Sequence, residues 1–177
     1  SLIHNAHIID EKVVTAMPNR LSKMVKKINR GPKNLRPWLL TKLFCSQVKY
    51  AGTTGIRILS IEPNRVEIEI ANKKKVQNHI GGVHAIAVAL MVESATGIVF
   101  GVNLDDSKLP LLKSMKMYFN RRMQGALTAV ATISDEQLAR LQNEEKGDML
   151  ISVVVTDESN ESPIECFMDW AWVTKNR

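Results

Sequence analysis

The feature that most limits how this chain can fold is an apolar run of 18 residues from Val83 to Phe100, in which His84 and Glu93 are the only titratable side chains. Such a run is barely long enough to cross a bilayer. A carboxylate near its middle would also oppose insertion by about 2.5–3.5 kcal/mol. We therefore expect a helix that is apolar all round because a curved sheet wraps it, which leaves no side for water.

The segments on both sides of this run predict antiparallel strands. Residues 56–60 and 66–71 alternate in polarity around the turn sequence 62–65, which indicates a hairpin with one wet face. Further alternating segments lie at 111–119, 126–133, 149–156 and 164–173, with a polar helix at about 135–145. One long apolar helix among five or six antiparallel strands predicts an α+β fold.

Composition narrows the class of protein. The 177 residues are 45% hydrophobic, which fits one core and excludes a disordered or collagen-like chain. The two cysteines, Cys45 and Cys166, have no metal-ligand spacing and are too few for a disulfide framework, so no metal or redox cofactor is expected. Residues 1–15 have no cleavable signal pattern, and the expected location is the cytoplasm.

The net charge of +6 is unevenly distributed. Residues 1–50 contain 10 Lys and Arg against 2 Asp and Glu, whereas the remainder contains 14 against 16. We expect a basic helical extension over 1–46, with one helix from about Pro18 to Gly31 and a second after Pro37, followed by the main domain at 47–177. Such a helix can lie on an anionic membrane, but packing on the parent domain is the favoured interpretation. No nucleic-acid partner is expected, since no aromatic residues are interleaved for base stacking.

The residues that begin the apolar helix suggest a reactive site. Gly81 and Gly82 precede the helix start, where free backbone N–H groups would stabilise an anion, including the oxyanion formed when a carbonyl is attacked. Glu93, an acid in an otherwise uncharged helix, should have a raised pKa and is a functional candidate. Since Glu93 follows Ala85 by eight residues, about 12 Å along one helix, both can act on one carbonyl only if two chains contribute.

Other interpretations of these residues remain open. His84 could only cap the helix, and Asn78 could be an ordinary turn residue. Glu93 could form a structural ion pair with an arginine. A metal site formed by His79, His84 and Glu93 is the least favoured interpretation, because the spacing does not place two ligands on one helical face.

The pattern Asn78-x-x-Gly81-x-x-His84, followed nine residues later by Glu93, resembles the hotdog-fold acyl-CoA thioesterases of the PaaI type and their DUF4442 relatives. The resemblance covers about residues 55–174. It implies a curved antiparallel sheet wrapped around a long central helix, in a homodimer or a dimer of dimers. It further implies that Asn78 holds the thioester or the attacking water, that His84 orients the loop, that the Ala85 N–H polarises the carbonyl, and that Glu93 drives hydrolysis from the other subunit.

The chain departs from that pattern at two places. Ala85 and Ile86 follow the histidine where relatives have two glycines, and many PaaI-type proteins have aspartate where Glu93 stands. The segment 118–125 resembles the strand end that passes the coenzyme A channel. Its Arg121 and Arg122, with Lys113, are expected to meet the phosphates, although exposed arginines are often only solvated.

The resulting hypothesis is a thioesterase that acts on an acyl-CoA or acyl-carrier thioester, with Glu93 as general base or nucleophile. One alternative is a non-catalytic module of the same fold that binds a fatty acyl chain, with a peripheral role at a membrane. Another is an enoyl-thioester hydratase, for which His84 would be the second acid or base. Acyl length does not follow from the sequence, because it depends on which side chains close the tunnel.

Overall fold

The computed structural model describes residues 19–175. In chain order its helices and strands are α1 (Arg20–Asn29), α2 (Arg36–Gln47), β1 (Arg57–Glu62), β2 (Arg65–Ile70), α3 (Ala85–Gly101), β3 (Lys108–Phe119), β4 (Leu127–Thr132), α4 (Asp135–Asn143), β5 (Gly147–Asp157) and β6 (Ile164–Thr174), with short 3₁₀ turns at Lys33–Leu35 (η1), Lys49–Thr53 (η2) and Lys74–Val76 (η3). These elements agree with the α+β fold and the N-terminal helices expected from the sequence.

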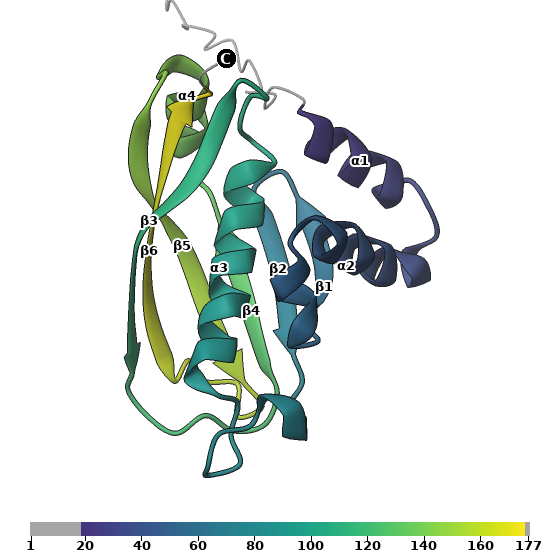
Figure 1. The fold of residues 1–177 in the computed structure, drawn as a ribbon, viewed down its shortest axis with the longest axis vertical. Helices are drawn as coiled ribbons and strands as arrows, with labels where there is room; N and C mark the ends of the chain where they lie inside the picture. The colour runs from purple at the N-terminus through teal and green to yellow at the C-terminus, as the bar shows by residue number, and fades with distance from the viewer. Residues whose placement is uncertain (1–18, 176–177) are drawn as a thin grey trace, which may run out of the picture.

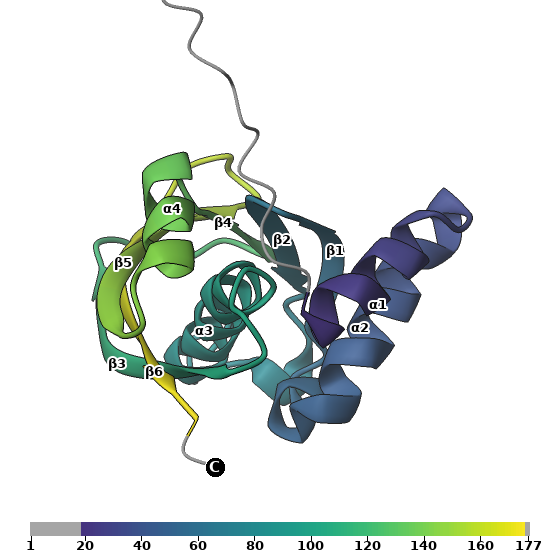
Figure 2. The ribbon, with the colours of Figure 1, turned by 90° about the horizontal axis from the view of Figure 1, so that it is seen from above.

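The six strands form one antiparallel sheet in the order β1-β2-β4-β5-β6-β3. The sheet curves around α3, which runs along its concave side (Figures 1 and 2). The curved sheet around a central helix confirms the expectation from the sequence. Within residues 19–175, no helix is both long and apolar enough to cross a membrane.

The core lies between α3 and the inner face of the sheet. Alternate residues of β2, Val66, Ile68 and Ile70, are completely buried against it. At the β6 side, the indole N–H of Trp170 donates to Thr96 Oγ1 at 2.9 Å. A Cβ at Gly97 would lie 2.9 Å from the Trp170 ring, so this glycine lets the indole lie directly against the helix.

One narrow strip of α3 is not covered by the sheet. It includes Ile86, which is 60% exposed, and the half-buried residues Glu93 and Gly101, which follow it at helical spacing. The expectation that no side of α3 faces water is therefore not met along this strip. The reason is that a single curved sheet surrounds only part of the helix circumference.

The two edges of the sheet differ in how they are protected. At β1 the arm helices satisfy backbone groups: Thr41 Oγ1 accepts from the Ile58 N–H at 2.9 Å, and Asn29 Nδ2 donates to the Ile61 carbonyl at 2.9 Å. Strand β3 pairs only with β6, and no described residue pairs with its outer edge. An unpaired strand edge readily accepts another strand, so β3 is the edge at which a second chain could join the sheet.

The N-terminal helices are fastened to the main domain. Asn19 caps α1 through a hydrogen bond from the Ser22 N–H, and its side-chain amide donates to the carbonyls of Gly101 and Leu104, each at 2.6 Å. Leu40 of α2 is 1% exposed and packs in the core. The described part of the extension is therefore packed on the domain, as the favoured interpretation of its apolar stripe required.

Candidate active site

A tight loop of residues 77–84 leads into α3. Gln77 and Val83 form an isolated β-bridge, and the His84 N–H donates to the Val76 carbonyl at 2.7 Å. Inside the loop, Asn78 Oδ1 accepts from the backbone N–H groups of Ile80 and Gly82 at 3.1 and 3.0 Å. Asn78 therefore organises the loop through its oxygen, as the turn interpretation requires. Among residues 19–175 its amide nitrogen has no acceptor, which leaves that N–H₂ group able to donate to a bound molecule.

Gly81 provides the backbone geometry that closes this loop. Its φ of +77° lies in the left-handed region, which glycine adopts without the strain that a Cβ would cause. The Gly81 carbonyl accepts a hydrogen bond from the Asn72 side chain at 2.9 Å. Gly81 thus contributes turn geometry and a fixed loop position.

His84 is the N-cap of α3. Its Nδ1 accepts from the Ile86 N–H at 3.1 Å, so in this arrangement the ring proton is on Nε2. The side chain is exposed, and its backbone is extended, with φ −62° and ψ 139°. This confirms that His84 can cap the helix, and the cap fixes where the first helical N–H groups point.

Ala85 is the first residue of α3, and within the described chain its N–H has no hydrogen-bond acceptor. It borders a cavity of about 390 Å³ lined by Asn78, Ile80, Gly82, Ala85, Phe119, Arg121, Arg122 and Met123. Free N–H groups at the start of a helix carry partial positive charge. No described residue therefore accepts from the predicted oxyanion donor, and Ala85 lines a cavity large enough for part of a ligand.

Glu93 lies on the uncovered strip of α3 and does not line that cavity. Burial raises the pKa of its carboxyl group above the usual value. Within the described residues the carboxylate has no ion-pair or hydrogen-bond partner, and the structural pair with an arginine is not formed. A partly buried carboxylate without a partner is unusual in a helix that is otherwise apolar.

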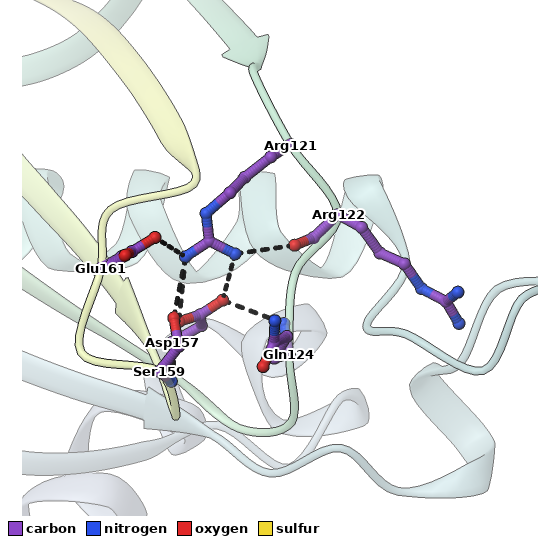
Figure 3. A network of polar contacts seen from close by, with 6 residues as sticks. All are labelled: Arg121, Arg122, Gln124, Asp157, Ser159 and Glu161. Atoms are coloured by element: carbon purple, nitrogen blue, oxygen red, sulfur yellow. Dashed lines mark hydrogen bonds and ion pairs between the residues drawn. The ribbon is translucent and has the colours of Figure 1, made fainter.

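Arg121 belongs to a polar network that fastens two loops together (Figure 3). Its guanidinium contacts both oxygens of Asp157, at 3.0 and 3.3 Å, and also Glu161 at 3.1 Å and the hydroxyl of Ser159 at 2.9 Å. The Asp157 side chain is completely buried. Arg121 is thus a structural cross-link between the segment after β3 and the β5–β6 turn, and most of its donors are occupied.

The pKa of Asp157 lies well below its usual range. Burial opposes the charged form, but hydrogen bonds from Ser159, from Arg121 and from the Gln124 N–H outweigh that effect. A lowered pKa means that the folded state holds the ionised carboxylate more favourably than the unfolded chain does. The network therefore stabilises the fold above the ordinary aspartate pKa, and this contribution is lost as the pH falls through the lowered value.

Replacing Arg121 with methionine is expected to lower the free energy of unfolding, because Asp157 would remain buried without its cation. Replacing Asp157 with asparagine should also destabilise the protein. The loss of unfolding free energy in this variant, relative to wild type, should be greatest above about pH 5 and should shrink below about pH 4. Urea unfolding at a series of pH values measures both effects, and a deficit that stays constant with pH would contradict the assigned role of Asp157.

Arg122 and Lys113 differ in their position relative to the loop. Arg122 is exposed, and its guanidinium donates to the Ile80 carbonyl at 2.7 Å. It lines both the cavity beside Ala85 and a neighbouring hollow of about 380 Å³. Lys113 pairs instead with Asp148 at 2.8 Å and precedes Phe119 by six residues, which is about 20 Å along β3.

The structure thus brings together some of the sequence-predicted residues and separates others. Asn78, Gly82, Ala85, Arg121 and Arg122 share one cavity, while Glu93 and Lys113 lie elsewhere. Gly81 is in the adjoining hollow. No three His, Cys, Asp or Glu side chains among residues 19–175 are grouped to hold a metal ion, so His79, His84 and Glu93 form no such cluster.

Several residues near the site were not predicted. Phe119 and Met123 line the cavity beside Ala85, and Tyr50 borders a hollow of about 230 Å³ that also includes His84 and Ile86. Phe119 and Met123 fall in the segment 118–125 singled out from the sequence, so their neighbourhood was predictable. Tyr50 was not, because it lies in the turn η2, and only the packing of that turn against α3 brings it beside His84 and Ile86.

A family model described as "Domain of unknown function (DUF4442)" matches residues 36–173, and so begins within the segment 1–46 assigned to the extension. Among curated proteins, none matches this chain. Several solved structures are similar, at identities that support a shared fold.

Three of these structures illustrate the likeness. PA5026 from Pseudomonas aeruginosa, described as a protein of unknown function and "Probable Thioesterase", is 20% identical, with a TM-score of 0.70 over 91% of this chain and 100% of that one. Thioesterase HI1161 from Haemophilus influenzae is 15% identical, with a TM-score of 0.63 over 78% and 90%. A mutant of thioesterase PA1618 from Pseudomonas aeruginosa is 14% identical, with a TM-score of 0.62 over 76% and 93%.

Proposed function

Because this chain belongs to the DUF4442 family and has the hotdog fold, we propose that it is a thioesterase that hydrolyses an acyl-CoA or acyl-carrier thioester. The observation that carries the proposal is Glu93, a partly buried carboxylate with a raised pKa and no partner in the described chain. It lies on the same helix whose first free N–H borders a cavity. The names of the similar structures agree with hydrolysis of a thioester.

The proposal requires two chains. Ala85 and Glu93 are eight residues apart in α3, about 12 Å along its axis, which is too far for both to act on one carbonyl. A second copy joined at the open edge of β3 would extend the sheet and bring the uncovered strips of the two α3 helices together. Related by a twofold axis, the two helices would each present their N–H end to the other's Glu93. We propose a homodimer, or a dimer of dimers built from it.

In the proposed reaction, water adds to the thioester carbonyl. The Ala85 N–H donates to the developing oxyanion, and the amide group of Asn78 holds the water or the thioester. Glu93 of the second chain removes the proton from the attacking water. The carbon–sulfur bond then breaks, the thiolate leaves and takes up a proton, and the products are a carboxylic acid and a free thiol.

The exposed guanidinium of Arg122 is the proposed contact for a coenzyme A phosphate. It already reaches the loop through the Ile80 carbonyl and lines the cavity beside Ala85. We leave Arg121 out of substrate binding, because its guanidinium is held by Asp157, Ser159 and Glu161. Lys113 is also left out, because it pairs with Asp148 far along β3.

The test is release of free thiol from short, medium, long and aromatic acyl-CoAs by the purified protein, with its oligomeric state measured by light scattering. We expect turnover by a dimer or larger assembly. Acyl-CoA binding without turnover would contradict the proposal and favour the non-catalytic acyl-binding module, for which Ile86 in place of a glycine is the relevant departure. Hydration of crotonyl-CoA without thiol release would instead favour the hydratase.

A further inference from the structure

The N-terminal helices form a strongly basic surface. Residues 19–50, here called the basic arm, contain nine Lys and Arg and no Asp or Glu. Arg20, Lys23 and Lys27 of α1 and its C-cap residue Arg30 follow one another at helical spacing and are all exposed. The basic arm therefore presents a row of cations to solvent on a helix that is packed against the domain.

Within the described residues, no cationic side chain of the basic arm forms an ion pair with a carboxylate. The ion pairs among residues 19–175 involve Arg57, Arg65, Lys113, Arg121 and Arg140, none of which belongs to the arm. Arg36 donates only to the carbonyl of Gly31. In the rest of the domain several basic side chains have a carboxylate partner, whereas among the described residues the only carboxylate bonded to the arm is that of Asp106, which accepts from the backbone N–H of Arg20.

Apolar side chains are exposed beside these cations. Trp38 of α2 is 59% exposed and Leu35, just before α2, is 47% exposed. They lie on one helical face with Lys42, whose Nζ is 4.9 Å from the centroid of the Trp38 ring. By contrast, Leu21, Val25 and Ile28 of α1 pack inward, while Met24 on the same helix is 39% exposed. The exposed Trp38 and Leu35 thus remain after the packing of the arm on the domain is complete.

We propose that the basic arm docks on an anionic lipid surface, with Trp38 and Leu35 entering the headgroup region between the basic side chains. Lys and Arg are attracted to the negative surface of a membrane, and tryptophan favours the interface because one part of its ring system is apolar and its N–H is polar. This inference goes beyond the proposed function and does not depend on it.

The combination of residues favours lipid over the other polyanions. A nucleic acid would satisfy the cations, but an aliphatic side chain such as Leu35 gains nothing from phosphates. In a membrane interface both Leu35 and Trp38 leave water, while flexible lysine side chains keep their charges at headgroup level. A lipid surface therefore accounts for both the charge and the exposed apolar residues, which a nucleic acid does not.

The first test is sedimentation of the full-length protein with vesicles of phosphatidylcholine alone or mixed with phosphatidylserine. We expect binding to the anionic vesicles that weakens as salt is added. The double variant Lys23→Gln/Lys27→Gln should have an affinity for these vesicles that is at least about tenfold lower than that of wild type. The charge-matched control Lys116→Gln/Lys146→Gln, outside the arm, should bind within about twofold of wild type.

The second test uses the tryptophan side chains. Of the three, Trp38 is exposed while Trp170 and Trp172 are 6% and 0% exposed, so a change in emission on adding vesicles would report Trp38. We expect a blue shift with anionic vesicles that is absent in Trp38→Phe. The proposal is overturned if neutral and anionic vesicles bind equally, if both double variants lose binding equally, or if the protein binds duplex DNA or RNA but no vesicles.

Discussion

Glu93→Gln is expected to reduce thiol release by about 10²–10⁴-fold, because glutamine cannot accept the proton of the attacking water. The substitution preserves the size and polarity of a side chain that has no ion-pair partner in the described structure. The fold should therefore survive. A kinetic comparison of the purified variant with wild type, using the best acyl-CoA of the series, measures the effect.

The pH dependence gives a second signature of the same residue. Burial raises the pKa of Glu93, and a general base must be deprotonated, so kcat/KM should rise with pH through that raised pKa. The free energy of unfolding should change in the opposite direction and fall as the pH rises. The folded state favours the protonated acid, so the carboxylate weakens the fold as the pH rises through the folded pKa. Glu93→Gln should thus be at least as stable as wild type at neutral pH.

The matched control for this variant is Glu165→Gln, which neutralises an exposed glutamate on β6. It should hydrolyse the substrate at the wild-type rate. Glu93→Asp tests whether the carboxylate must extend as far as it does in glutamate to contact the attacking water, since it keeps the carboxylate but shortens the side chain by one methylene. If Glu93→Gln and wild type release thiol equally, the catalytic role of Glu93 is wrong, even if the protein proves to be a thioesterase.

Ala85→Pro is expected to reduce thiol release by about 10²–10³-fold, the usual effect of losing one oxyanion donor. Proline removes the backbone N–H, and the first position of a helix is where proline is best tolerated. His84, the preceding residue, already has the extended backbone that proline requires, with φ −62° and ψ 139°. The variant should therefore fold with α3 intact, which circular dichroism and thermal unfolding can verify.

Ala85→Gly is the control, because it keeps the N–H and removes only the side-chain methyl group. Its activity should remain close to wild type. Equal activity of Ala85→Pro and Ala85→Gly would show that this backbone N–H is not an oxyanion donor.

Mixing the two inactive variants tests whether the site is shared between chains. A dimer of one Glu93→Gln chain and one Ala85→Pro chain has one site with both groups intact. Random assembly makes half the dimers mixed, so about a quarter of wild-type activity should return. No recovery would indicate that both groups act within one chain, which contradicts the proposed dimeric site.

Much of the fold followed from local patterns. The apolar run at 83–100 predicted α3, which spans Ala85–Gly101, and the alternating segments predicted the strands to within a few residues. The helix start was equally local: His84 caps α3 two residues before Ile86, and the loop is closed by contacts between near neighbours. These features depend on residues close in sequence, whose preferences act over one or two turns.

The roles of the charged residues depended on distant partners. Arg121 and Arg122 are adjacent in sequence, yet Arg121 is held by Asp157, 36 residues further on, while Arg122 remains exposed at the loop. Lys113 is similarly paired with Asp148 across the sheet. Neither pairing follows from spacing, because strand order and register determine which side chains face each other.

Residue type and spacing were thus enough to predict a long apolar helix, the strands around it, a capped N–H end and an isolated acid. Three-dimensional packing alone decided that Glu93 has no partner in the described chain, that the arm helices cover the β1 edge, and that β3 and one strip of α3 are left open. The physical reason is that burial and pairing arise from contacts between segments far apart in the chain, which local preferences do not encode.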